Sequence, residues 1–336
     1  MILINVHTWM PKSSIHEIPA PRSLPCTGIA TLSCPDLVLQ STLMNSTPST
    51  LALPPGSCDS HTHVFLDPRE YPWSPARRYT PPPASIDALC QWHDALGIER
   101  VVIVQPSVYA ADNAATLQAL RVLGRRRARG VAVIDDGMAE AGLDAMHELG
   151  VRGVRVNLEI DQASDAGAAT AQLRRTAARV ARLGWHVQVY ANLPLLAACA
   201  DVLAALPVPV VLDHYAGAHA AGGVRQPGLQ AVLALVKGGN AYVKLSAPYR
   251  LSRAQDFSDM EPLARLFMDT RADRMVWGSD WPHPQPGTRP DPHEISPPFE
   301  VDSGRVLDAL RAWAPDDAVF RRILVDNPAR LYDFDG

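Results

Sequence analysis

The sequence predicts an α/β fold, a (β/α)8 TIM barrel preceded by an irregular N-terminal extension. From residue 57 onward, eight short runs rich in β-branched residues alternate with Ala- and Leu-rich helical stretches. The runs are apolar on both faces, as strands are in a parallel sheet covered by helices, and eight such units close into a barrel. An open doubly wound sheet is the alternative. It would require a Gly-rich turn after the first strand, where the sequence reads His61-Thr62-His63.

The predicted elements follow in a regular order. The strands cover residues 57–64, 100–105, 130–134, 153–157, 185–190, 208–213, 241–246 and 274–279. Helical stretches lie between them and after the last strand, at 85–96, 112–126, 139–149, 167–183, 194–205, 226–237, 259–271, 305–313 and 318–324. Two long irregular segments, 67–83 and 281–299, follow strands, so we expect them at the C-terminal mouth of the barrel, where loops build active sites.

The first 55 residues differ in composition from the rest of the chain. Ser, Thr and Pro are frequent there, hydrophobic periodicity is poor, and Met10 and Met44 interrupt the stretch. We interpret residues 1–55 as a disordered extension, or as the result of a start codon placed too early, and 56–336 as the barrel. A functional pro-segment or lid is the alternative interpretation.

Composition and charge exclude several classes of protein. The net charge is -4, with 31 Lys and Arg against 35 Asp and Glu and no extended basic patch, so we expect no nucleic-acid partner. The chain has no apolar run of about 18 residues and no signal-peptide pattern, so we expect no membrane association and no export. The five cysteines have scattered spacings that fit neither a disulfide framework nor a CxxC site, which favours a cytoplasmic location.

Polar side chains stand at the ends of seven predicted strands. His61 and His63 are two residues apart, so both should point into the barrel near its mouth. A His-x-His pair alone is a weak signal, but inward polar groups on six other strands strengthen it. Those groups are Gln105 and Ser107, Arg155 and Asn157, Tyr190 and Asn192, Asp213 and His214, Lys244 and Ser246 with Tyr249 and Arg250, and Asp280 with His283.

Six motifs together resemble the amidohydrolase superfamily, in particular the lactonases similar to 2-pyrone-4,6-dicarboxylate hydrolase in amidohydrolase-related family 2. The motifs are DSHTH at 59–63, GVRVN at 153–157, LDH at 212–214, VKLSAPYR at 243–250, VWGSDWPH at 276–283 and NPARLY at 327–332. The resemblance spans about residues 57 to 334. It implies a hydrolase that opens a lactone, or a similar cyclic ester, carrying a carboxylate or other anionic group.

The resemblance also implies roles for individual residues. Asp280 would take a proton from water and return it to the leaving oxygen. The imidazoles of His61, His63 and His214 would hold Asp280 and donate hydrogen bonds to the substrate carbonyl oxygen. Substrate-binding residues would be Arg155 and Arg250, which suit an anion, and the hydrogen-bond donors Tyr79, Ser107 and Tyr190. For either arginine, the alternative is a salt bridge at the barrel rim.

Two departures from the superfamily pattern bear on cofactor and substrate. Metal-dependent members carry a His on strand 5 and often Lys or Glu on strand 4, whereas this chain has Tyr190 and Arg155. We therefore favour no metal, as in lactonases that work without one, because a guanidinium opposes a cation. Gly217 stands where the dicarboxylate lactonase has Arg, and Asp161 lies in a stretch where that enzyme brings a further arginine, so the sequence does not name the lactone.

Three hypotheses remain open at this stage. The first is the metal-free lactonase. The second places a divalent ion, zinc or manganese, on His61, His63 and Asp280, which gives a metal-dependent hydrolase or a decarboxylase of aromatic acids. The third is a catalytically inactive barrel kept for ligand binding or assembly, which we would expect to have lost Asp280 or the histidines. The sequence does not determine the oligomeric state.

Overall fold

The structure, a computed structural model, describes residues 52–159, 165–287 and 289–334. It confirms the predicted barrel: eight strands pair in parallel in the order in which they occur along the chain. Nearly all of the predicted extension, residues 1–55, lies outside the described residues. The strands are β1 (Cys58–Thr62), β2 (Arg100–Val104), β3 (Ala128–Ala132), β4 (Val151–Asn157), β5 (His186–Tyr190), β6 (Val210–Leu212), β7 (Ala241–Ser246) and β8 (Met275–Gly278).

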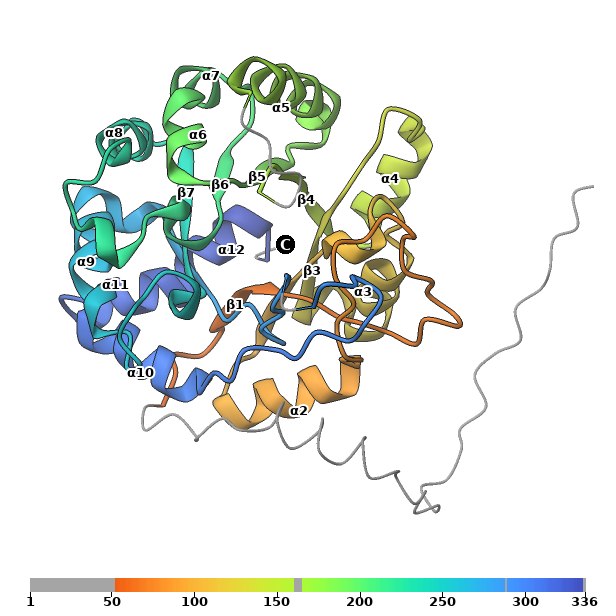
Figure 1. Cartoon of the computed structure of the whole chain (residues 1–336), viewed down its shortest axis with the longest axis horizontal. Helices are drawn as coiled ribbons and strands as arrows, with labels where there is room; N and C mark the ends of the chain where they lie inside the picture. The colour runs from red at the N-terminus through yellow and green to blue at the C-terminus, as the bar shows by residue number, and fades with distance from the viewer. Residues whose placement is uncertain (1–51, 160–164, 288, 335–336) are drawn as a thin grey trace, which may run out of the picture.

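A ring of helices surrounds the strands (Figure 1). A typical one, α2, begins after Ser85, whose side chain accepts a hydrogen bond from the Ala88 N–H, and ends at Gly97, which has a φ of 76°. The helices are α2 (Ile86–Leu96), α3 (Ala114–Arg127), α4 (Glu140–Glu148), α5 (Ala166–Val180), α6 (Leu193–Ala198), α7 (Ala200–Ala204), α8 (Leu229–Gly238), α9 (Glu261–Arg271), α10 (Ser303–Trp313), α11 (Asp317–Arg321) and α12 (Asn327–Tyr332). None of the helices in the described residues is long and apolar enough to cross a membrane.

The helices differ from the prediction in three places. The stretch predicted at 194–205 is divided at Cys199 into α6 and α7. Helix α8 begins only at Leu229, because Gly228 before it adopts a left-handed conformation with a φ of 89°. Helix α12 was not predicted; it is only six residues long and follows a π-helical turn, so it shows no periodicity of its own.

The two ends of the barrel have different chemistry. Helix α12 lies at the centre of the ring in Figure 1, where the fully buried Tyr332 packs against Cys58, Val102 and Val131 at the lower end of the barrel. These side chains fill that end with a small apolar cluster. The polar side chains of the predicted site gather at the opposite end, as the (β/α)8 fold requires of an active site.

The seam between β8 and β1 closes the barrel and positions the site. The backbone N–H of Asp280 donates to the carbonyl oxygen of His61 at 2.8 Å, and the N–H of His63 donates to the carbonyl oxygen of Trp281 at 2.8 Å. Because these bonds join the segment after β8 to the end of β1, they fix the carboxyl of Asp280 beside both imidazoles.

An irregularity in β1 decides which of its polar residues face the interior. The pairing of β1 with β2 shifts register between Asp59 and Thr62. As a result Asp59 does not join the site, although simple alternation groups it with His61 and His63. Its carboxylate accepts hydrogen bonds from the Ser279 N–H at 2.9 Å, and it lies 3.2 Å from Nε2 of His93 on α2.

Candidate active site

Two histidines from β1 face the carboxyl of Asp280. Nε2 of His61 lies 3.6 Å from Oδ1 of Asp280, and Nε2 of His63 lies 3.4 Å from the same oxygen. The ring of His214, which follows β6, has its centroid 4.8 Å from that of His61. All four side chains are buried. The structure therefore brings the four predicted catalytic residues together.

The Nδ1 atom of each imidazole is held by a partner. His63 Nδ1 lies 2.8 Å from the carbonyl oxygen of Val104, which can only accept, so this nitrogen carries a proton. His214 Nδ1 lies 2.8 Å from the hydroxyl of Ser246. A neutral His63 is therefore an acceptor at Nε2. This changes our expectation for His63, because it can donate a hydrogen bond to a carbonyl oxygen only when the ring is doubly protonated.

The second oxygen of Asp280 is occupied by two donors. The Tyr249 hydroxyl donates to Oδ2 at 2.8 Å and Nε of Arg250 donates to it at 2.9 Å. Burial opposes ionisation of the carboxyl, but the charge of Arg250 outweighs it and holds the pKa of Asp280 well below its ordinary value. Nη2 of Arg250 also donates to the carbonyl oxygen of Pro284. Of the two predicted anion-binding arginines, Arg250 thus already pairs with the carboxylate of Asp280.

A second buried carboxylate, Asp213, is the centre of a polar network beneath the histidines. It lies 3.3 Å from Nδ1 of His61 and 3.4 Å from Nη2 of Arg155, and accepts a hydrogen bond from Gln188 at 3.0 Å. Lys244, which is completely buried, donates to Gln188 at 2.7 Å and lies 3.6 Å from Asp213. Burial lowers the pKa of Lys244 to about 8.

Three residues that contact Asp213 or Asp280 were not assigned a role from the sequence. They are Gln188, Lys244 and Tyr249. Lys244 shares a strand face with Ser246, and Gln188 shares one with Tyr190, so two-residue alternation was the available signal. Tyr249 directly precedes Arg250, but its contact with Asp280 depends on the turn that follows β7, which periodicity does not describe.

Several residues of the site adopt backbone conformations that cost energy. Asp280, His283 and His214 have φ values of 63°, 61° and 48°, and Ala247 has a φ of 49°. Such left-handed conformations in residues other than glycine cost about 1–3 kcal/mol each and cluster where function requires them. Their positions after β6, β7 and β8 place this strain at the mouth of the barrel.

The predicted substrate-binding residues line a small cavity next to Asp280, which we call the reaction cavity. Eight of the nine predicted site residues line it; the exception, His61, is completely buried beside Asp280. Burial raises the pKa of Tyr79 to about 12, so its hydroxyl keeps its proton and can donate. The lining is formed by His63, Tyr79, Ser107, Arg155, Asn157, Tyr190, His214, Arg250, Asp280, Pro284 and Pro286.

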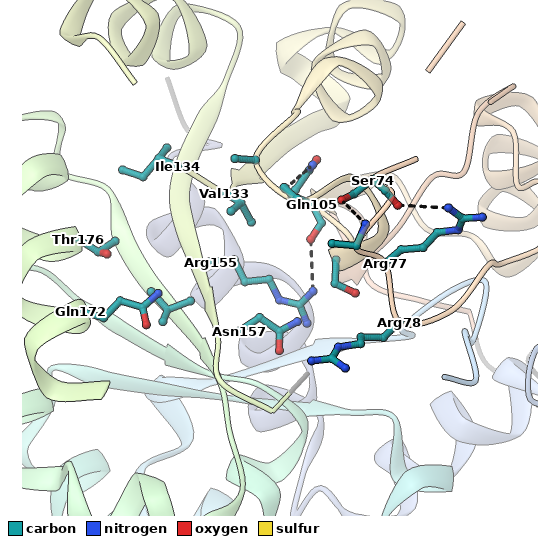
Figure 2. Close-up of a pocket in the computed structure, with 15 residues that line it drawn as sticks. Ser74, Arg77, Arg78, Gln105, Val133, Ile134, Arg155, Asn157, Gln172 and Thr176 are labelled. Carbon is teal, nitrogen blue, oxygen red and sulfur yellow. Dashed lines mark hydrogen bonds between the residues drawn. The ribbon is translucent and has the colours of Figure 1, made fainter. Parts of the chain in front are cut away.

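A larger pocket, which we call the annex, adjoins the reaction cavity (Figure 2). Its volume is about 300 Å³, and it shares Ser107, Arg155 and Asn157 with the reaction cavity. The annex reaches from the segment after β1 to helix α5, and its other lining residues are Ser74, Ala76, Arg77, Arg78, Gln105, Ala110, Ala111, Val133, Ile134, Val156, Gln172 and Thr176.

The donor atoms at the centre of the site suit a divalent ion. His61, His214 and Asp280 each offer one ligand atom, and these atoms lie within 4.8 Å of one another. Nε2 of His63, which belongs to the predicted ligand set, lies 3.4 Å from Asp280. Imidazole nitrogens and a carboxylate oxygen are ligands that zinc accepts. His61 Nε2 is buried and has no hydrogen-bond partner within the described ranges.

The surrounding charges oppose such an ion. Lys244, Arg155 and Arg250 are buried cations, or nearly so, and they pair with the carboxylates of Asp213 and Asp280. Arg250 already occupies one oxygen of Asp280. A divalent ion would add two positive charges to a poorly solvated region that already holds three cations, and this is costly at short range.

Comparison with known proteins identifies relatives over nearly the whole barrel. The chain is 35% identical over 290 residues to a 2-pyrone-4,6-dicarboxylate hydrolase of Comamonas testosteroni, which covers 83% of this chain and 91% of the relative. It is 33% identical over 292 residues to a 4-sulfomuconolactone hydrolase of Hydrogenophaga intermedia, covering 85% and 91%. The crystal structure of a putative 2-pyrone-4,6-dicarboxylic acid hydrolase of Pseudomonas putida superposes with a TM-score of 0.72 at 29% identity, covering 84% of this chain and all of that one. A model of the amidohydrolase family matches residues 58–334, and the chain therefore belongs to this family, as its motifs predicted.

Proposed function

We propose that this protein hydrolyses a lactone, or a similar cyclic ester, that carries an anionic group. The observation that carries the proposal is the ionised, buried carboxylate of Asp280, with one oxygen held by Tyr249 and Arg250 and the other facing the histidines. The named relatives act on lactones with carboxylate or sulfonate groups according to their names, which supports the same class of substrate here.

The proposed reaction begins with a water molecule held by Asp280 and His63. Oδ1 of Asp280 and Nε2 of a neutral His63 are both acceptors, 3.4 Å apart, so a water molecule that donates one hydrogen bond to each satisfies both. The water oxygen attacks the carbonyl carbon, and the water proton then moves to Asp280. The ring C–O bond then breaks, and the proton on Asp280 passes to the leaving oxygen.

His214 and His61 complete the electrostatic part of the mechanism. Burial lowers the pKa of His214 to about 4, so its ring is neutral near pH 7. We assign His214 the tautomer in which Nδ1 accepts from the Ser246 hydroxyl and Nε2 carries the proton, so that Nε2 can donate to the carbonyl oxygen as negative charge develops there. Burial and the nearby Lys244 lower the pKa of His61 as well, so His61 is neutral.

The anionic group of the substrate would bind on the Arg155 side of the reaction cavity. Arg155 lies between Asp213 and the ring of Tyr190, and its buried Nε has no acceptor in the part of the chain that the structure describes. Tyr79 and Ser107 line the same wall and supply further donors. Arg250 contributes its charge while it holds Asp280.

We further propose that the reaction proceeds without a metal ion, because three cations surround the donor atoms. The alternative is a divalent ion on the imidazoles and Asp280, which the ligand geometry favours. A screen of anionic lactones tests both proposals when it is run before and after prolonged dialysis against a strong chelator, beside elemental analysis. We expect hydrolysis that survives metal removal. Loss of activity with the metal and its return with zinc or manganese would refute the metal-free mechanism, and hydrolysis of no lactone would refute the substrate class.

A further inference from the structure

Lys244 lies in the polar network beneath the histidines, and the proposed reaction gives it no role. Its side chain is completely buried, where an ammonium group is costly unless it is paired and hydrogen-bonded. Nζ lies 3.2 Å from Nδ1 of His61, donates to Oε1 of Gln188 at 2.7 Å and lies 3.6 Å from Oδ1 of Asp213. One of the three neighbours of this ammonium group is therefore the ring of a predicted catalytic residue.

The ring of His61 has different neighbours at its two nitrogens. Nδ1 faces the ammonium group of Lys244, which can only donate, and the carboxylate of Asp213, which can only accept. Nε2 lies 3.6 Å from Oδ1 of Asp280, which also can only accept. A neutral imidazole carries one proton, on Nδ1 or on Nε2, so these neighbours decide which nitrogen is the donor.

Only one position of the proton suits both ends of the ring. With the proton on Nε2, Lys244 donates to the lone pair of Nδ1, and the N–H at Nε2 faces the Asp280 side of the site. With the proton on Nδ1, that N–H would lie beside an ammonium group, and the lone pair of Nε2 would face a carboxylate. The neighbours at both nitrogens therefore favour the first tautomer.

Asp213 competes weakly for the proton of His61. Its Oδ2 already accepts from Gln188 at 3.0 Å and from Arg155 at 3.4 Å. Its Oδ1 lies 3.3 Å from Nδ1 of His61 but forms no hydrogen bond within the described ranges, whereas the contact between Nδ1 and Lys244 has hydrogen-bond geometry. Lys244 is therefore the partner of Nδ1.

We propose that Lys244 sets the tautomer of His61, so that Nε2 carries the proton and donates to the carbonyl oxygen of the substrate. This inference rests on the proposed lactonase function. It makes Lys244 a positioning residue, because Lys244 acts through His61 and does not line the reaction cavity. The two histidines of β1 then have opposite tautomers: His63, protonated on Nδ1 against Val104, accepts from the water, and His61 donates to the carbonyl oxygen.

Nitrogen NMR of the full-length protein with isotope-labelled histidine, near pH 7, reports which ring nitrogen is protonated. The comparison is with Lys244→Met, which keeps the length of the side chain and removes its donors. We expect His61 to be protonated on Nε2 in the wild type and on Nδ1, toward Asp213, in the variant. The signals of His61 are those that disappear in His61→Gln. His63 is the internal control and should stay protonated on Nδ1, because the carbonyl oxygen of Val104 can only accept.

Kinetics with the best anionic lactone test the consequence for catalysis. Lys244→Met should lower kcat at least about 100-fold, the usual effect of losing one donor to the developing oxyanion, and change KM less than about threefold. Lys237→Met makes the same exchange at an exposed position of α8 and should change neither constant.

A double variant separates the role of a donor from mere damage to the network. In Lys244→Met combined with Asp213→Asn, the amide oxygen should take the place of Oδ2, because Gln188 and Arg155 donate there. The amide nitrogen then faces Nδ1 of His61 as a new donor. We expect the proton of His61 to return to Nε2 and kcat to recover at least about tenfold relative to Lys244→Met, whereas independent structural damage would lower kcat further.

The outcomes distinguish this inference from the proposed function. A wild-type His61 protonated on Nδ1 or on both nitrogens, an unchanged tautomer in Lys244→Met, or no recovery of kcat in the double variant would overturn the inference. If Lys244→Met alone does not fold, the double variant decides, and a proton on Nδ1 of its His61 would be the contrary result. The expected tautomers in a wild type that hydrolyses no lactone would retain the role of Lys244 and reject the lactonase proposal.

Discussion

Replacing Asp280 by Asn removes the proton acceptor and keeps the shape of the side chain. The amide oxygen can still accept from Tyr249 and Arg250, which now lie 2.8 and 2.9 Å from Oδ2, and the amide nitrogen can face the histidines. Hydrogen bonds to a charged group contribute about 1.5–3 kcal/mol and those to a neutral group about 0.5–1.5 kcal/mol. The two weakened bonds should therefore lower the free energy of unfolding by about 2–3 kcal/mol, which a barrel of this size tolerates.

The effect on catalysis should be much larger than the effect on stability. Loss of a general base lowers turnover by about two orders of magnitude or more. We expect kcat for the best anionic lactone to fall at least about 100-fold, with an unchanged dissociation constant measured by calorimetry. Formate or azide should restore part of the rate in Asp280→Ala, because a small anion can take the place of the missing carboxylate.

A third buried carboxylate, Asp59, provides the control for Asp280. Asp59 also accepts hydrogen bonds from backbone and side-chain donors, but it lies outside the reaction cavity. Asp59→Asn should lose stability on a similar scale and keep turnover within about tenfold of the wild type. If Asp280→Asn keeps more than a tenth of the wild-type kcat, or if both variants lose turnover equally, Asp280 is not the base.

Three further predictions concern the fold. Gly153→Ala should lower the free energy of unfolding by about 2 kcal/mol or more, because the new Cβ would lie 2.3 Å from the buried ring of His186; Gly238→Ala, with nothing within 4 Å of its Cβ, should be neutral or stabilising, and equal melting temperatures of the two variants would contradict the argument. The second prediction is acid sensitivity. Burial and the charge of Lys244 lower the pKa of His186 to about 3, so the unfolded chain, with a histidine pKa of about 6.5, binds the extra proton between these values. Stability should therefore fall as the pH drops below about 6.5, by about 1.4 kcal/mol per pH unit for this group, and urea titrations at pH 5 and 7 should show a smaller difference for His186→Met. Third, a shortened chain that begins at Met44 should fold and keep its activity, because the residues before it lack a core-like pattern; failure of this chain to fold would show that the extension has a structural role.

The eight-unit barrel could be predicted because its signal is local and repeated. Each strand is a short apolar run bounded by polar residues, and all eight predicted runs overlap a strand of the structure. The grouping of His61, His63, His214 and Asp280 could be predicted for a related reason. In a parallel barrel all strand ends meet at one mouth, so residues far apart in sequence converge without any knowledge of side-chain contacts.

The partners of these side chains could not be predicted, because they depend on details that periodicity does not contain. Alternation groups Asp59 with the two histidines, and only the register shift in β1 directs it toward His93 instead. Likewise the resemblance predicts Arg250 as an anion-binding residue, but its contact with Asp280 depends on the turn after β7. The position of the backbone decides which partners Asp59 and Arg250 contact, and periodicity does not describe that position.

The low pKa of Asp280 has a consequence for the order of events in the proposed reaction. A carboxylate held ionised by Arg250 is a weak base, so it cannot remove a proton from unperturbed water. It can do so once the water oxygen has begun to bond to the carbonyl carbon, because that bond makes the water proton acidic. The attack must therefore be driven by the donors around the carbonyl oxygen, and proton transfer follows it. The same low proton affinity makes the protonated Asp280 a strong acid, which suits the second half of the reaction, where it must protonate the leaving oxygen. The three cations around this site support the proposal of an anionic substrate and no metal ion, because they attract an anionic group and repel a divalent ion.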